Sequence, residues 1–184
     1  MSDQYDDELY DFSVKSMTEP IERLFEREYP TEYGIFLSGA TLSEAYQGDA
    51  TPIDLLYLAG GPRSLHAVKL LSTYDSCLFD VNEGIHALRG IQCNFCWIGL
   101  PLDEFRDGEA EYNGILEKTC TDRGIGIITV QPRGRGLSAK IINAPERDDG
   151  DHLDAYVALR KRWRATKDRN ISADGFQVVD YYGR

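Results

Sequence analysis

The sequence predicts a single α/β domain built around a mixed central β-sheet. Its 184 residues are enough for one domain with a buried core. Short apolar runs of strand length alternate with segments in which apolar residues recur at helical spacing. The predicted order is helix, three strands, helix, strand, helix, two strands, helix. Three consecutive strands indicate a meander, and the fourth strand returns beside them through a helix, which makes the sheet mixed.

The first helix is predicted to begin at Thr18, whose hydroxyl can cap it, with Pro20 in the first turn, and to end at Tyr29-Pro30. We interpret residues 1–15 as an acidic lead-in, 16–166 as the domain, and 167–184 as a C-terminal tail in which 176–182 can add a strand. The strands are predicted at 33–37, 53–59, 65–71, 95–100, 126–130 and 138–142. The remaining helices are predicted at 80–89, 112–120 and 149–163.

The chain is strongly acidic, with 31 acidic and 20 basic residues and a formal net charge of −11. Asp outnumbers Glu, and only six of the basic residues are lysines. Such an acidic, lysine-poor composition suits a salt-rich cytoplasm and predicts a halophilic source. At low salt the net charge repels nucleic acid overall, whereas local basic patches can still bind phosphate.

The sequence also predicts where the protein resides. No run of 18 apolar residues is present, which predicts that the chain has no membrane span. Residues 1–12 are acidic and lack the basic and apolar segments of a secretory signal. We therefore expect a cytoplasmic protein with no membrane partner.

Four cysteines include a C-x-x-C pair, Cys93 and Cys96, a spacing that metal sites also use. A zinc ribbon needs a second such pair or suitably spaced histidines, and the three histidines are scattered along the chain. The pair leads directly into the apolar segment 97–100, which predicts a strand. Residues three apart in a strand point to opposite faces, so we expect two separate buried thiols.

Two short segments contain the residues most relevant to chemistry. Segment 52–56 (PIDLL) places Asp54 on the second predicted strand, and segment 66–70 (HAVKL) places Lys69 on the third, 15 residues later. Because side chains alternate along a strand, Lys69 shares its face with Ala67. If the two strands are neighbours, Asp54 and Lys69 suit a shared site.

This series of elements and residues resembles the PD-(D/E)xK nuclease-like superfamily, which has the restriction-endonuclease-like fold. The core of that superfamily is a helix, three strands, a helix and a strand, with an Asp on the second strand and an acid-x-Lys on the third. Segments 97–101 (WIGLP) and 123–128 (RGIGII), followed by Ala144-Pro145, are similar to later segments of a bacterial branch of uncharacterised nuclease-like proteins. The resemblance covers about residues 18 to 165.

Hydrolysis of a phosphodiester by such an enzyme uses Mg²⁺ held by carboxylates, with a lysine near the attacking water. The resemblance implies Asp54 as metal ligand and Lys69 as catalytic lysine, but position 67, where the family has its second acid, is alanine. Glu83 on the following helix can supply the missing metal ligand, with Asp80 less suitably placed, and the resemblance also implies Glu22 on the first helix. Alternatively, Asp54 pairs with Lys69 and Glu83 is solvated.

Two groups of basic residues are candidates for binding nucleic acid. Arg133 and Arg135 flank a glycine at a predicted hairpin tip. The second group, near the end of the last predicted helix, locally reverses the sign of the charge, and arginine suits phosphate recognition. A solvated helix end stabilised by the helix dipole explains the second group equally well. The second group contains Arg160, Lys161, Arg162 and Arg164.

These observations leave three functions open. The first is a nuclease-like domain of nucleic-acid metabolism with impaired or lost catalysis, which binds DNA, RNA or a protein partner. The second is an active Mg²⁺-dependent phosphodiesterase with a relocated acid. The third is a protein-interaction module without nucleic-acid binding, such as a homodimer. A second carboxylate within about 5 Å of Asp54 favours a metal, whereas an ion pair between Asp54 and Lys69 disfavours catalysis.

Overall fold

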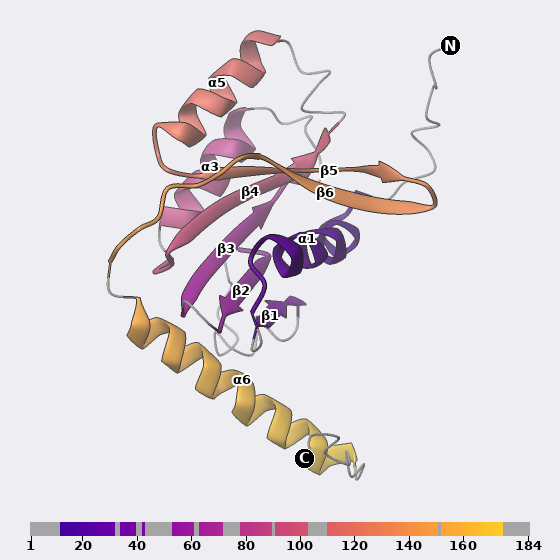
Figure 1. Cartoon of the computed structure of the whole chain (residues 1–184), viewed down its shortest axis with the longest axis vertical. Coiled ribbons are helices and arrows are strands. Elements are labelled where there is room, and N and C mark those ends of the chain that lie inside the picture. Colours follow the sequence, from indigo (N-terminus) through magenta and orange to yellow (C-terminus); the bar gives the residue numbers. More distant parts are fainter. Residues whose placement is uncertain are drawn as a thin grey trace.

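The computed structural model describes residues 12–31, 34–39, 42, 53–60, 63–71, 78–89, 91–102, 110–150 and 152–174. At its centre is one six-stranded sheet in the order β1-β2-β3-β4-β5-β6 (Figure 1). The α/β class and the mixed sheet are therefore confirmed. The strands are β1 (Ile35–Ser38), β2 (Leu55–Ala59), β3 (Ser64–Leu70), β4 (Phe95–Pro101), β5 (Gly126–Arg133) and β6 (Gly136–Asn143).

The meander, the return of the fourth strand beside it and the final hairpin pair as predicted, whereas the neighbour of β5 was not predicted. β1, β2 and β3 form an antiparallel meander. Helix α3 (Leu78–Arg89) then crosses over the sheet, so that β4 runs parallel to β3. Helix α5 (Ala110–Thr121) makes a second crossover, because β4 and β5 are also parallel and parallel neighbours need such a connection. β5 and β6 form an antiparallel hairpin, in whose turn Gly134 has a positive φ of 63°.

Helix α1 (Val14–Glu28) begins one turn earlier than predicted. Ser13 is the N-cap, and its side chain accepts a backbone N–H of the first turn. Thr18 caps nothing, since its hydroxyl donates to a backbone carbonyl one turn earlier at 2.7 Å. Pro20 lies inside the helix rather than at its start, and the extra turn is stabilised because Met17 becomes fully buried.

Helices cover both faces of the sheet, which explains why β2 is buried along its whole length. α1 packs on the face that presents Tyr57 and Trp97. α3, α5 and the start of α6 (Leu153–Asp174) pack on the opposite face, which presents Leu56 and Ala67. Because side chains alternate along each strand, this arrangement decides which helix lies over each candidate site residue.

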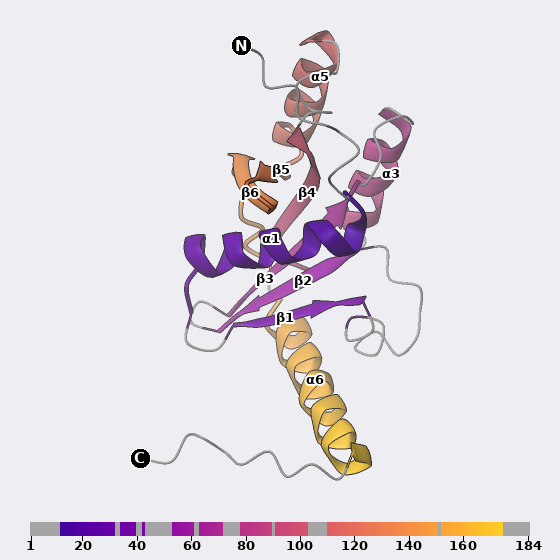
Figure 2. The same ribbon diagram turned by 90° about the vertical axis from the view of Figure 1, so that its right-hand side faces the viewer.

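The last helix is longer than predicted. α6 continues to Asp174, so the predicted boundary between the domain at 166 and a tail at 167 falls inside a helix. No glycine or proline follows Trp163 until Gly175, and nothing in the sequence therefore stops the helix earlier. Its first turns pack on the domain through Tyr156 and Leu159, and the helix then runs away from the sheet (Figures 1 and 2).

Several predictions concern segments at the two ends. Residues 1–11 of the predicted lead-in lie outside the described residues, and residues 14 and 15 belong to α1. The strand predicted at 176–182 also lies outside the described residues. No helix in the described ranges combines the length and the apolar character that crossing a membrane requires.

Candidate functional site

Asp54 and Lys69 meet across the antiparallel pair formed by β2 and β3. Leu55 is opposite Val68 in the register, so Asp54, immediately before β2, lies opposite Lys69 near the end of β3. Lys69 Nζ lies 3.1 Å from Asp54 Oδ2. The same carboxylate oxygen accepts the backbone N–H of Leu70 at 2.7 Å. The two residues therefore form an ion pair that a backbone hydrogen bond holds in place.

This ion pair is largely shielded from solvent. The exposed fraction of the side chain is 17% for Asp54 and 28% for Lys69. Ala67 lies on the same face of the sheet and is fully buried. Helix α3 covers the pair so closely that a Cβ atom added at Gly84 would lie 3.2 Å from Lys69 Cγ. The pair thus lies between the sheet and α3, beside the methyl group of Ala67, at the position where the resemblance to the nuclease-like superfamily implies an acid.

Glu83 is the residue proposed to replace that acid. It directly precedes Gly84, the residue of α3 that packs against Lys69. Its side chain is exposed to solvent. The side chain of Asp80, the alternative on the same helix, lies outside the described residues.

Glu22 lies on the other side of the sheet. It belongs to α1, next to Ile21, which packs in the core of the face opposite to Lys69. Burial raises the pKa of Glu22 above its usual value, and the nearby carboxylates of Glu26 and Glu19 raise it further. The pKa of Glu22 is therefore raised by burial first and by neighbouring acids of α1 second, and the Asp54–Lys69 pair is not among these causes.

The donor atoms around Asp54 do not fit a Mg²⁺ ion. Mg²⁺ takes oxygen ligands in octahedral geometry at about 2.1 Å. One carboxylate oxygen of Asp54 is already bound by the Lys69 ammonium group and by a backbone N–H. Within the described part of the chain, no three His, Cys, Asp or Glu side chains gather as a metal site.

A second candidate site is a groove of about 1070 Å³ between α1 and the hairpin of β5 and β6. α1 packs against both strands, so that one edge of the helix faces the hairpin (Figure 2). Arg23 and Arg27 line the groove from α1, and Arg133 and Arg135 line it from the hairpin. We call this surface the arginine groove.

The arginine groove is basic although the whole chain carries a net charge of −11. Among the described lining residues, one glutamate lies beside the four arginines. Arg23 and Arg27 form ion pairs with glutamates of the same helix. Arg133 and Arg135 are exposed, and neither forms an ion pair with another described residue. The hairpin arginines are therefore available to bind an anion.

The two arginines of α1 were missed by sequence analysis. They alternate with glutamates, a pattern that is typical of a solvated helix surface with ion pairs between residues four apart. The signal that could have identified them is their own spacing, because Arg23 and Arg27 are four residues apart and so lie on one face of the helix. What the sequence did not reveal is that this face borders the hairpin.

The basic residues of the last helix lie elsewhere. Arg160 Nη1 donates to Tyr156 Oη at 2.9 Å. Lys161, Arg162 and Arg164 are exposed on α6, which leaves the domain well away from the hairpin tip (Figures 1 and 2). The structure therefore separates the two groups of predicted phosphate-binding residues into two different surfaces.

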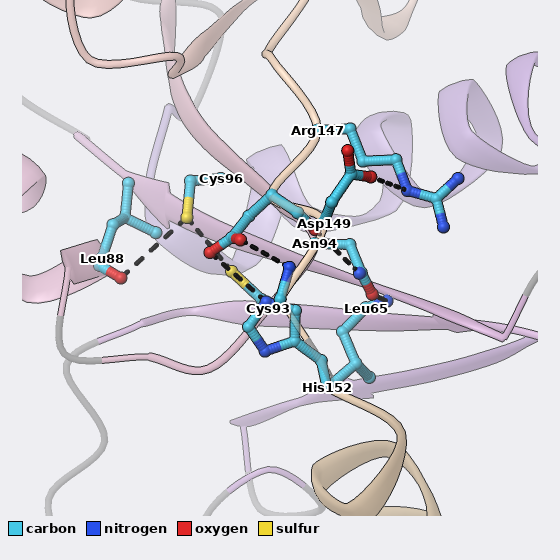
Figure 3. Close-up of polar contacts among 10 residues, drawn as sticks. Leu65, Leu88, Cys93, Asn94, Cys96, Arg147, Asp149 and His152 are labelled. Atoms are coloured by element: carbon cyan, nitrogen blue, oxygen red, sulfur yellow. Dashed lines mark hydrogen bonds and ion pairs between the residues drawn. The ribbon is translucent and has the colours of Figure 1, made fainter.

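The prediction that the C-x-x-C thiols diverge is wrong. Cys93 Sγ and Cys96 Sγ lie 3.1 Å apart (Figure 3). The alternation of side chains along a strand does not apply, because β4 begins only at Phe95 and Cys93 lies in the coil before it. Both thiols belong to the core beneath α3, and they do not form a disulfide.

Comparisons with known proteins bear on the fold alone. No protein-family model and no curated protein matches the chain. The fold is similar to that of a protein of unknown function from Silicibacter pomeroyi, with a TM-score of 0.56 and 9% sequence identity. The similarity covers 91% of this chain and 97% of that chain. At this identity it shows a shared fold over nearly the whole chain.

Proposed function

We propose that the protein is a nuclease-like domain of nucleic-acid metabolism that binds DNA or RNA and has lost catalysis. The observation that carries the proposal is the arginine groove, in which four arginines from two elements line one cavity. Guanidinium groups bind phosphate through paired, charge-assisted hydrogen bonds. Although the chain as a whole carries a net negative charge, the groove is a local basic surface that attracts a polyanion.

The order and pairing of the elements support the nuclease-like part of the proposal. A helix precedes a meander of three strands, and a crossover helix leads to a fourth strand parallel to the third. This is the order that the resemblance to the PD-(D/E)xK superfamily implies. Asp54 and Lys69 lie opposite each other at the two positions that correspond to the family motif.

The surroundings of Asp54 support the loss of catalysis. The second acid of the motif is replaced by Ala67, which is fully buried. The carboxylate of Asp54 is bound by Lys69 and by the amide of Leu70. A lysine that is paired with the remaining acid is less effective at stabilising charge on a phosphate, and the pair joins β2 to β3.

Binding is tested by fluorescence anisotropy with labelled single- and double-stranded DNA and RNA of one length, over a range of salt concentrations. We expect the double variant Arg133→Gln/Arg135→Gln to weaken binding at least about tenfold, or about 1.4 kcal/mol, because it removes two exposed guanidinium groups that can bind phosphate. The slope of log affinity against log salt should fall by up to about 2.

The matched control is Lys161→Gln/Arg164→Gln, which removes the same charge from the exposed surface of α6. A smaller loss of affinity in this control than in the hairpin variant supports the arginine groove. Equal losses would mean that only the total charge matters. A loss confined to the control would place the binding surface on α6 instead. If the folded wild type binds none of these nucleic acids at all salt concentrations tested, the proposal is wrong.

Catalysis is tested separately, by incubating the same nucleic acids with Mg²⁺ or Mn²⁺ over the same salt range. We expect no metal-dependent cleavage by the wild type, because Ala67 stands at the position where the resemblance implies the second acid. Cleavage that is lost in both Asp54→Ala and Lys69→Ala would overturn the proposed loss of catalysis. Glu83→Gln would then show whether the exposed carboxylate on α3 is the relocated acid.

A further inference from the structure

The two thiols of the C-x-x-C segment are already close to bonding geometry. Cys93 Sγ and Cys96 Sγ lie 3.1 Å apart, and an S–S bond is about 2.05 Å long. Closing this gap requires the sulfur atoms to approach by about 1 Å, which rotation about the side-chain torsions can provide. Cys93 lies in the coil that precedes β4, so the strand ladder does not oppose such a movement.

The backbone that carries this pair is held firmly on both sides. Asn94 pairs with Leu65 through two hydrogen bonds, one from its backbone N–H at 3.0 Å and one to its side-chain Oδ1 at 3.0 Å. Its side-chain Nδ2 donates to the carbonyl of Asp148 at 3.1 Å, and its own carbonyl accepts the amide of Asp148 at 2.8 Å (Figure 3). These four bonds keep the two sulfur atoms together in the reduced protein.

A small molecule can reach the pair from outside. Both cysteines line a cleft of about 350 Å³ under the end of α3, a volume within the range of small-ligand sites. Cys96 is partly exposed, whereas Cys93 is 2% exposed. Among the described lining residues, two arginines balance two acids, so this part of the lining does not repel neutral or charged reagents. Cys96 is the sulfur atom that an incoming reagent meets first.

The hydrogen bond between the two thiols makes them chemically unequal. The thiol of Cys93 can donate to Cys96, which lowers the pKa of Cys96 although burial opposes its ionisation. The same bond, with burial, raises the pKa of Cys93. A thiolate is the attacking species in thiol–disulfide exchange, and both accessibility and charge therefore favour Cys96 as the attacking residue.

We propose that Cys93 and Cys96 form a thiol–disulfide exchange site whose oxidant is a small-molecule disulfide. The thiolate of Cys96 attacks one sulfur atom of the small disulfide, a mixed disulfide forms on Cys96, and one small thiolate leaves. Cys93 then loses its proton and attacks the Cys96 sulfur, the Cys93–Cys96 bond forms, and the second small thiolate leaves. The two thiolates take up the two protons of the cysteines, so two electrons pass from the protein to the oxidant.

The proposal is tested on the full chain with oxidised and reduced glutathione as the redox buffer and a chelator present. Free thiols are alkylated after equilibration, and each cysteine-containing peptide is identified by mass spectrometry. We expect the peptide that contains Cys93 and Cys96 to lose both of its free thiols and to carry one disulfide between them. The fully buried Cys120, whose pKa burial raises to about 12, should stay reduced and is the internal control.

A synthetic peptide with the sequence of residues 90–99 is the reference for an unrestrained C-x-x-C. The folded pair should be half-oxidised at a ratio of oxidised to reduced glutathione at least about tenfold lower, because the fold holds its sulfur atoms together. Cys93→Ser should trap one glutathione on Cys96, and Cys96→Ser should trap none on Cys93.

Two results would overturn the proposal. One is a folded wild type in which both thiols remain reduced in a buffer that oxidises the peptide. The other is trapped glutathione on Cys93 in Cys96→Ser with none on Cys96 in Cys93→Ser, because the attacking residue would then be wrongly assigned. Circular dichroism of each variant shows whether it is folded. None of these readouts involves nucleic acid, so their outcome is independent of the proposed function.

Discussion

His66 is a buried histidine whose hydrogen bonds require it to be neutral. It is 1% exposed, and its Nδ1 accepts the indole N–H of Trp97 at 3.3 Å. An accepting Nδ1 places the ring proton on Nε2, which lies 3.4 Å from Ser64 Oγ. The rings of Tyr29 and Phe95 pack against the imidazole at 4.7 and 4.6 Å between centroids. Burial therefore lowers the pKa of His66 to about 3.

This depressed pKa makes stability depend on pH in a definite direction. The unfolded chain binds a proton on His66 below its ordinary pKa of 6.5, and the folded chain does so only near 3. Stability is therefore lost as the pH falls through this window, by up to about 1.4 kcal/mol per pH unit. We expect the wild type to lose about 2 kcal/mol more than His66→Asn between pH 6.5 and pH 5.

Urea denaturation of both proteins at the two pH values measures this difference. Asn is the suitable replacement because its side-chain oxygen can still accept the N–H of Trp97 but does not titrate. Carboxylates titrate in both proteins, so their contribution cancels when the two losses are subtracted. Equal losses in the two proteins would show that His66 does not carry this part of the pH dependence.

A glycine on β5 leaves room for the side chain of a tryptophan on the neighbouring strand β4. Gly126 lies opposite Trp97 in the register of the two parallel strands. A Cβ atom at position 126 would lie 2.5 Å from Trp97 Cε3 and 2.8 Å from Pro145 Cδ. The indole is fully buried and has no room to move aside. We expect Gly126→Ala to lower the free energy of unfolding by about 1–3 kcal/mol, measured by urea denaturation.

Gly114→Ala is the matched control for that substitution. Gly114 is exposed on α5, and a Cβ atom there would meet nothing within 4 Å. Alanine is the better helix former, so the same chemical change should raise stability by about 0.5–1 kcal/mol. If both variants were destabilised alike, the cost would come from the added methyl group in general and not from the contact with Trp97.

The sequence predicted the kinds and order of these elements because their causes are local. Apolar residues form short runs in the strands and recur at helical spacing in the helices. A helix between two consecutive strands allows those strands to pair in parallel. The errors lie at element ends, where tertiary contacts decide. α1 gained a turn by burying Met17, and α6 continued past residue 166 because no breaking residue occurs there. The alternation of side chains along a strand does not apply to Cys93, because Cys93 lies two residues before β4.

The candidate sites were less predictable, since each joins residues that are distant in sequence. Asp54 and Lys69 could be paired in advance because neighbouring strands in a meander are adjacent in space. The arginine groove could not, because the position of α1 beside the hairpin depends on how the sheet and helix pack. Arg133 and Arg135 were found from their turn, whereas the spacing of Arg23 and Arg27 shows only that they share one face of α1 and not which element that face borders.

Salt should have two opposed effects on this protein, because the net charge of the chain is negative whereas the arginine groove is basic. The acidic side chains repel one another on balance, since the chain carries a net charge of −11. Raising the salt from 0.1 to 1 M shortens the screening length from about 10 to about 3 Å, which weakens this repulsion. The same screening weakens attraction between the arginine groove and a polyanion. Folding and nucleic-acid binding should therefore respond to salt with opposite signs.

We expect the stability of the wild type to rise by about 1 kcal/mol between 0.1 and 1 M KCl, or about 2–4 °C in Tm for a chain of this size. The control is Glu26→Gln/Glu83→Gln/Glu117→Gln, which removes three negative charges from exposed positions outside the arginine groove. Because it repels itself less, this variant should be more stable at 0.1 M KCl and gain less from added salt.

A Tm that rises equally in both proteins would indicate a general effect of the salt on apolar burial, since screening acts in proportion to the charge that is present. A Tm that falls with salt in the wild type would mean that attractive ion pairs, and not net repulsion, dominate the electrostatic part of its stability.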